Sequence, residues 1–308
     1  MTERWLWTQK QDVGPSPRGQ HEMPYDAARK RVVLFGGANV LGRLNDTWEW
    51  DGRAWAEVAD TGPSGRTSFG MVYDDARQRI VLFGGSDERT LFGDTWEWDG
   101  EDWTQVADIG PAPRGSFAMA YDKVRRHVVL FGGSGPGVNF NDTWAWDGTD
   151  WTQIADTGPP ARRLSSMVFD SSRECLVLFG GEEGGTEADP TRTPVNDTWE
   201  WGDDDTGWVK VQDIGPRNFI SPKMVYTGKH TVLYGSPEPA GRGQTWEWDG
   251  RVWTQRQNMG PIASVHPALA YDSQRDRVVL FGGLNRDEGV PTYLGDTWEL
   301  AIVEPPPA

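Results

Sequence analysis

One pattern occurs six times along this 308-residue chain and constrains its fold more than any other feature. Each copy holds an apolar run that ends in an aromatic residue and a Gly pair (Gly235-Ser236 in the fifth copy), then a loop, then a segment close to Asp-Thr-Trp-Glu-Trp-Asp-Gly. The aromatic residue, at first spaced by 48 residues, recurs at Phe35, Phe83, Phe131, Phe179, Tyr234 and Phe281. A period of this size predicts stacked supersecondary units, because one unit alone cannot bury its own faces.

Each copy is predicted to form four short strands, named a to d in chain order. Strand b is apolar throughout, which indicates burial on both faces, and strand c alternates as a strand with one inner face does. Asp99-Gly100 between strands c and d is typical of a tight hairpin turn. In the second copy the strands are expected at about 69–73, 80–83, 94–98 and 103–106. Six such antiparallel sheets bury both faces by radial packing, so we predict an all-β, six-bladed β-propeller.

The last copy lacks a strand d of its own. The Trp that marks strand d occurs at Trp7, Trp55, Trp103, Trp151, Trp208 and Trp253, and none follows Trp298. The Trp7-Thr8-Gln9 segment resembles Trp103-Thr104-Gln105. We therefore expect residues 1–13 to complete the sixth blade, residues 301–308 to form a C-terminal tail, and residues 1–308 to form a single domain.

Composition narrows the possible partners. A formal net charge of −16 argues against nucleic-acid binding, which needs clustered Lys and Arg, and disfavours anionic membranes. No apolar run approaches the length that spans a bilayer, and the first residues show no signal peptide, so a cytoplasmic location is expected. Cys175 lies in an apolar strand, and the chain has only four His, so we predict neither a metal site nor a cofactor. A monomer is favoured.

The repeat resembles the Kelch repeat. The Gly pair after an apolar strand, the aromatic residues of strands c and d, and the Arg before strand a all match, over about residues 5–300. The resemblance implies a six-bladed propeller similar to the propeller domain of galactose oxidase. It does not imply that enzyme's copper site, which needs His, Tyr and a crosslinked Cys, because here the one Cys lies in a core strand and the His are too few. Kelch proteins serve as protein-binding modules, sugar-acid isomerases or substrate-shaping domains, so fold alone leaves the function open.

Loop lengths indicate which surface varies between copies. The b–c loops hold 8, 8, 8, 15, 7 and 12 residues, whereas the a–b and c–d turns hardly change. In a meander the b–c and d–a loops lie at the same end, and we call the surface that they form the loop face. Variable loops on a regular scaffold are typical of a binding surface. The longest loop, 182–196, is predicted to be a lid, a partner-contact element or a plain insertion, and the role of the next longest, 284–295, is left open.

The d–a loops carry the candidate ligand-binding residues. Three positions after each Gly-Pro stand Arg18, Arg66, Arg114, Arg162, Phe219 and Ser264. These Arg brace the loops or pair with Asp of adjacent repeats, or else they form a partial positive ring for a carboxylate or phosphate. The following positions add further candidates, namely Gln20, Ser68, Ser116, Arg163 and His266.

Three functions remain open. The first is a binding module that holds a protein, peptide or small anion on the loop face. The second is a cofactor-independent isomerase, epimerase or cyclase that acts at the mouth of the propeller's central channel, with His21 or His266 transferring the proton. The third is a carbohydrate-binding propeller, for which few loop aromatics exist: Phe92, Phe140, Phe219 and Tyr293.

Overall fold

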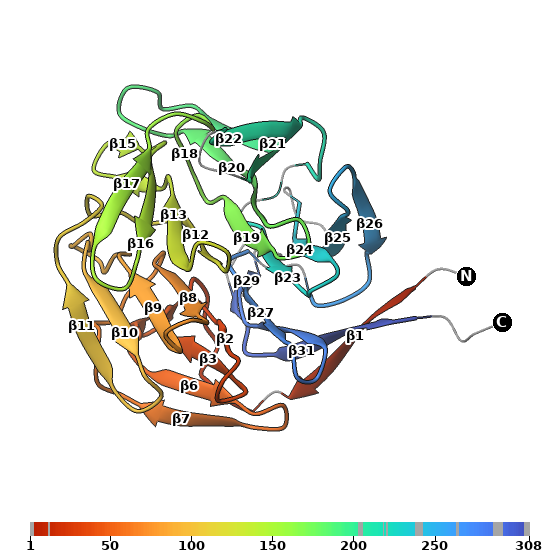
Figure 1. Ribbon diagram of the computed structural model, residues 1–308. Coiled ribbons are helices and arrows are strands. Elements are labelled where there is room, and N and C mark those ends of the chain that lie inside the picture. Colours follow the sequence, from red (N-terminus) through yellow and green to blue (C-terminus); the bar gives the residue numbers. More distant parts are fainter. Residues whose placement is uncertain are drawn as a thin grey trace.

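The structure is a computed structural model that describes residues 3–11, 13–202, 206–217, 219, 221–237, 243–262, 265–285 and 292–304. It confirms the predicted fold: six four-stranded antiparallel sheets form the blades of a β-propeller. Figure 1 shows the blades in chain order around a ring, with strand a of each blade nearest the centre. The described part of the chain contains no helix with the length and apolarity needed to span a membrane.

The strands lie close to the predicted positions. Blade 1 consists of β2 (Tyr25–Asp26), β3 (Arg31–Phe35), β6 (Thr47–Trp50) and β7 (Trp55–Ala59). Blade 2 consists of β8 (Gly70–Asp74), β9 (Arg79–Phe83), β10 (Thr95–Trp98) and β11 (Trp103–Ala107). Blade 3 consists of β12 (Ala118–Asp122), β13 (His127–Phe131), β16 (Thr143–Trp146) and β17 (Trp151–Ala155). Blade 4 consists of β19 (Ser166–Asp170), β20 (Cys175–Gly184), β21 (Arg192–Trp201) and β22 (Trp208–Gln212). Blade 5 consists of β23 (Lys223–Tyr226), β24 (Thr231–Gly235), β25 (Gln244–Trp248) and β26 (Trp253–Gln257). Blade 6 consists of β27 (Ala268–Asp272), β28 (Arg277–Phe281), β31 (Thr297–Val303) and β1 (Arg4–Gln11).

The N-terminal strand completes the sixth blade, as predicted. β1 pairs antiparallel with β31, so that both ends of the chain contribute to one sheet. The register aligns Trp5 with Ile302 and Arg4 with Val303, so β31 runs three residues past Leu300, where we expected the tail to begin. Trp5 is buried at 4% exposure, which gives the closing strand an apolar anchor.

Neighbouring blades are joined by the same hydrogen bond at every junction. The indole of the strand-d Trp donates to the hydroxyl of the Thr that opens strand c in the preceding blade, over 2.8–2.9 Å. The six pairs are Trp7–Thr245, Trp55–Thr297, Trp103–Thr47, Trp151–Thr95, Trp208–Thr143 and Trp253–Thr198. The Trp55–Thr297 bond joins the first blade to the last, so the junction where the ring closes has the same contact as the others.

The strand-c Trp residues lie in the core between blades, as predicted from their regular spacing. Trp50, Trp98 and Trp146 are each at most 1% exposed. A buried Trp removes about 150–250 Å² from water, so these side chains account for much of the apolar contact between sheets. Cys175 belongs to the same core, and burial raises the pKa of its thiol to about 12, which leaves it protonated and unreactive.

The fifth blade uses different residues at a repeated polar contact. In four blades an Arg of the a–b turn contacts the Glu of strand c: Arg29–Glu49, Arg77–Glu97, Arg173–Glu200 and Arg275–Glu299. The shorter turn of the fifth blade has no such Arg. There the imidazole of His230 contacts Glu247, which also accepts hydrogen bonds from Arg256.

Candidate functional site

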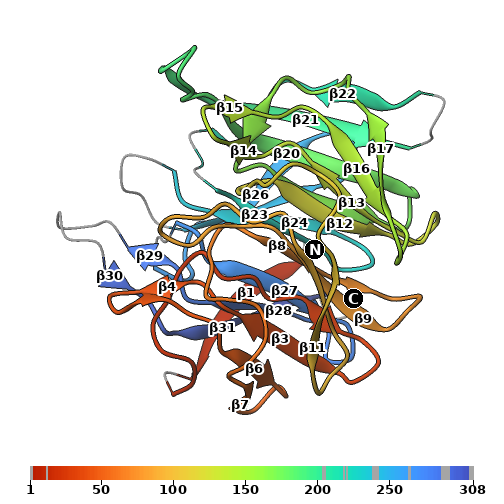
Figure 2. The ribbon, with the colours of Figure 1, turned by 90° about the vertical axis from the view of Figure 1, so that its left-hand side faces the viewer.

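The b–c and d–a loops lie at one end of the propeller, as the meander geometry predicts. Each d–a segment forms a bridge to a b–c loop, and the described bridges are Gly19–Ala38, Thr67–Ser86, Gly115–Ser134, Phe219–Pro237 and Val265–Leu284. Three b–c loops form small hairpins of two strands each: β4 (Ala38–Asn39) with β5 (Gly42–Arg43), β14 (Ser134–Gly135) with β15 (Val138–Asn139), and β29 (Leu284–Asn285) with β30 (Thr292–Tyr293). Figure 2 shows these hairpins projecting from the same side of the ring.

The four Arg of the d–a loops are buried and paired with Asp. Arg18 is 0% exposed, and its Nη1 and Nη2 donate to Asp46 Oδ1 and Oδ2 over 2.6 and 2.7 Å. Its remaining donors bond the Ser16 and Gly36 carbonyls and the Ser16 hydroxyl. The equivalent pairs are Arg66–Asp94, Arg114–Asp142 and Arg162–Asp197. These guanidinium groups therefore brace the loops, and each Asp comes from the same repeat rather than the adjacent one.

The pairing sets the ionisation of the Asp side chains. Burial acts to raise the pKa of Asp46, but the hydrogen bonds and charge of Arg18 outweigh it and hold the pKa below its ordinary value. The same balance lowers the pKa of Asp94, Asp142 and Asp197. Each Asp remains an anion at neutral pH and compensates the buried Arg.

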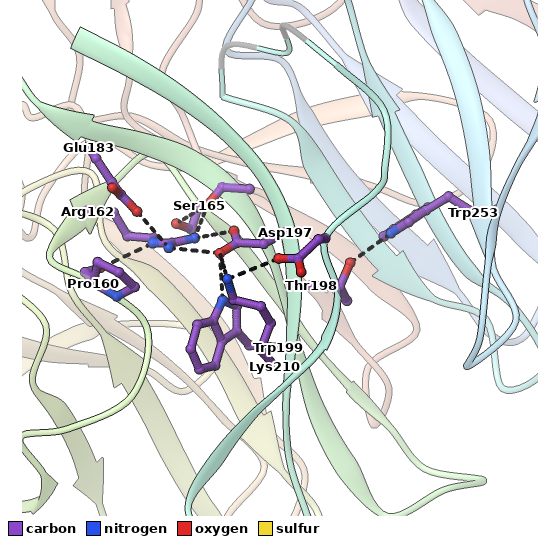
Figure 3. A network of polar contacts seen from close by, with 11 residues as sticks. Pro160, Arg162, Ser165, Glu183, Asp197, Thr198, Trp199, Lys210 and Trp253 are labelled. Carbon is purple, nitrogen blue, oxygen red and sulfur yellow. Dashed lines mark hydrogen bonds and ion pairs between the residues drawn. The ribbon is translucent and has the colours of Figure 1, made fainter. Parts of the chain in front are cut away.

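In the fourth blade the Arg pair also anchors a projecting hairpin. Arg162 Nη2 donates to Glu183 Oε1 as well as to Asp197 (Figure 3). The neighbouring Arg163 pairs with Glu182. Both Arg form β18 (Arg162–Arg163), which pairs with the extension of β20. Most of the 182–196 segment thus continues β20 and β21 as a β-hairpin instead of forming an irregular loop.

Six equivalent residues line the mouth of the central channel on the loop face. All adopt the left-handed conformation, with φ between 52° and 60°, and they surround a hollow of about 40 Å³. They are Gln20, Ser68, Ser116, Leu164, Ser221 and His266. Backbone hydrogen bonds link some neighbours, for example from Gln20 N to His266 O over 3.1 Å. The structure therefore brings Gln20, Ser68, Ser116 and His266 together at the channel mouth.

His21 does not line this hollow. Its imidazole is 0% exposed, and neither ring nitrogen has a hydrogen-bond partner. The ring packs edge-on against Phe281 at 5.6 Å, which is the distance at which the equivalent Phe69 and Phe117 pack against the preceding blade. His21 thus occupies a scaffold position that the second and third repeats give to Phe. Burial, with smaller effects of Arg18 and Lys223, lowers the pKa of His21 well below its ordinary value.

Replacing His21 by Phe should flatten the pH dependence of stability. A neutral buried His binds its proton only when the chain unfolds, so the wild type loses stability as the pH falls below about 6.5, by up to about 1.4 kcal/mol per pH unit. Unfolding free energies measured between about pH 7.5 and 5.5 should fall less for H21F than for the wild type. The matched variant F69H should show a steeper fall. Parallel curves for all three proteins would contradict this account.

The aromatic loop residues also have partners. Arg66 lies over the ring of Phe92 at 4.1 Å and Arg114 over that of Phe140 at 3.8 Å. Phe219 is 5% exposed and packs in the core between the fourth and fifth blades. These three rings therefore contribute to the scaffold, and only the fourth candidate, Tyr293, lies on a projecting hairpin.

Sequence reasoning missed two charged residues inside the channel, Glu22 and Lys223. Both stand opposite the aromatic residue that ends strand b, a position that is small in the other four repeats: Gly70, Ala118, Ser166 and Ala268. The Lys223 ammonium forms an ion pair with the Glu22 carboxylate. Burial raises the pKa of Glu22 although Lys223 opposes the shift. Sequence comparison between the repeats could have identified both residues, because they are charged at a position where the other copies have Gly, Ala or Ser.

Below this pair the channel widens into a cavity of about 360 Å³, which we call the channel cavity. Strand a of every blade contributes to its wall, including one aromatic residue each: Tyr25, Tyr73, Tyr121, Phe169, Tyr226 and Tyr271. Exposed residues of the a–b turns, such as Asp75 and Lys123, lie at its other end. The cavity thus reaches the surface opposite the loop face. Among the described residues, no group of three or more His, Cys, Asp or Glu is placed to hold a metal ion.

Comparison with known proteins supports the repeat assignment. No curated protein sequence matches the chain. The family model for the KLHDC2/KLHL20/DRC7 Kelch-repeats domain matches residues 52–236, which is more than half of the chain. With six blades built from the same repeat, the chain belongs to the Kelch-repeat family of β-propellers.

Proposed function

We propose that the protein is a Kelch-type binding module that holds a protein or peptide partner on its loop face. The observation that carries this proposal is the set of blade-specific hairpins that project there with exposed apolar tips. Val40 and Leu41, at the tip of the β4–β5 hairpin, are 86% and 90% exposed, and Val138 on the β14–β15 hairpin is 44% exposed. Exposed aliphatic residues at the tips of anchored loops suit the core of a protein interface.

The polar residues at the channel mouth would add specificity at the centre of this surface. Gln20, Ser68, Ser116 and His266 offer hydrogen-bonding groups around the hollow. We assign Arg18, Arg66, Arg114 and Arg162 an indirect part, because their donors already bond Asp and backbone carbonyls. Arg163 and Phe219 likewise support the loops that a partner would contact.

The size of the hollow favours a macromolecular partner over catalysis at the mouth. Pockets that enclose small molecules hold about 300–1,000 Å³, well above the 40 Å³ found here. A substrate could not be enclosed there. A protein partner needs only a surface with good complementarity and does not need a deep pocket.

Charged substitutions at the hairpin tip test the proposal. We expect the double variant V40D/L41D to bind an affinity-captured partner at least about tenfold more weakly, because Asp in the buried core of an interface must lose its hydration. The matched control is V124D, since Val124 is 54% exposed on an a–b turn at the opposite end. Quantitative mass spectrometry of captured proteins, with melting curves for folding, gives the readout. A partner retained by V40D/L41D but lost by V124D would place binding on the other surface.

A further inference from the structure

The Glu22–Lys223 ion pair connects two blades that are not neighbours. Glu22 precedes the first blade and Lys223 opens the fifth, so the pair spans the sixth blade, where Ala268 occupies the equivalent position. The Ala268 side chain is a single, fully buried methyl group. Because it is so small, it does not come between the two charges. The two charges therefore meet across the channel because the four other positions of this ring are small.

The pair separates two spaces. Glu22 and Lys223 line both the small hollow on the loop face and the channel cavity below it. The cavity therefore has a charged floor and an opening among the a–b turns. Its volume of about 360 Å³ falls within the range of pockets that enclose small molecules.

The cavity wall combines aromatic rings and thioethers with polar groups. Besides the six aromatic residues it includes Met23, Met71, Met119, Met167 and Met224, one from each of the first five blades. Thioethers and aromatic rings accept varied apolar groups with favourable contacts. A ligand with an apolar or aromatic body can contact these rings and thioethers while a charged end reaches the floor.

The charge of that end follows from the cost of opening the pair. The Glu22 and Lys223 side chains are 24% and 23% exposed, so both are accessible from the cavity yet largely desolvated. A ligand with one charge would bind one partner and leave the other buried without compensation, which is strongly unfavourable. A ligand with both charges replaces one ion pair by two and leaves no charge uncompensated.

We propose that the channel cavity binds a small zwitterion, an α-amino acid with an apolar or aromatic side chain, whose carboxylate pairs with Lys223 and whose ammonium pairs with Glu22. The side chain extends along the Met and aromatic wall toward the a–b turns. The cavity opens opposite the loop face, so its ligand can enter whether or not the loop face binds a protein.

Three related probes test the charge requirement. Phenylalanine carries both charges, 3-phenylpropionate only the carboxylate, and 2-phenylethylamine only the ammonium. In calorimetric titrations near neutral pH, phenylalanine should bind at least about tenfold more tightly than either analogue. Equal affinities for the three probes, or no binding of phenylalanine at about 10 mM, would overturn the proposal.

Variants locate the site. E22Q and K223M should each weaken phenylalanine binding by at least about tenfold, whereas E57Q and K210M, which change the same charges outside the cavity, should bind as the wild type does. V72F narrows the cavity without touching the ion pair and should also weaken binding. Its result decides the question if E22Q or K223M fails to fold. Phenylalanine binding that survives both V72F and K223M would exclude this cavity, and loop-face variant V40D/L41D should leave phenylalanine binding unchanged.

Discussion

Removing residues 1–12 will lower the melting temperature of the propeller by about 10 °C or more. The deletion takes away the outer strand of the sixth blade, seven aligned residues opposite β31, and the buried Trp5. It also removes the Trp7 indole that bonds Thr245 in the fifth blade. Loss of a buried Trp alone costs about 3–5 kcal/mol, and in a domain of this size each kcal/mol shifts the melting temperature by about 2–4 °C.

Two controls separate closure from general damage. Leu6 and Thr8 lie on the exposed side of β1, so L6A and T8A should change the melting temperature little. A synthetic peptide with the sequence of residues 3–12 should restore stability to the truncated protein in proportion to its concentration. An unchanged melting curve after the deletion would contradict the closure of the ring by β1.

Replacing Arg114 by Ala will destabilise the protein by about 3–5 kcal/mol. The change removes the two hydrogen bonds to Asp142 and those to the Ala112 and Gly132 carbonyls, and leaves a largely buried carboxylate without its cation. Lys at this position should recover only part of the loss, because it cannot bind both Asp142 oxygens in one plane. Denaturant unfolding of R114A, R114K and the wild type measures the effect.

The double variant R66A/R114A extends the test to the ring of Arg. The two residues belong to different blades, so their effects on the unfolding free energy should add. R53A is the matched control, since Arg53 lies exposed in a c–d turn. If R66A/R114A unfolds as the wild type does but loses a ligand, the Arg would bind that ligand directly and would not serve as braces.

The fold could be predicted because its determinants are local and repeated. The strand-d Trp recurs six times and the Gly pair five times, so each position could be assigned from several copies. Trp7 identified the closing strand by its resemblance to the other strand-d Trp residues. The candidate site is different. Arg18 and Asp46 are 28 residues apart, and sequence left open whether such Arg pair with Asp or face a ligand. Only the three-dimensional arrangement places each Arg beside the Asp of its own repeat.

Residues that depart from the repeat were harder to interpret. His21 was a candidate for proton transfer because His is rare in this chain, yet it occupies the position of Phe69 and Phe117. Glu22 and Lys223 are 201 residues apart, and nothing local indicates that they meet. Aligning the repeats would have shown both as exceptions among small residues, but the ion pair itself depends on the closure of the ring.

The composition of the sixth blade sets the order in which this protein can be completed during synthesis. β1 is made before the strands of the other five blades and its partner β31 after them, so the strand that holds Trp5 has no partner until β31 has left the ribosome. Contacts between such distant segments slow folding, and an unpaired apolar strand is prone to aggregate in the meantime. Five blades can form as they emerge, whereas the ring can close only after translation has reached β31.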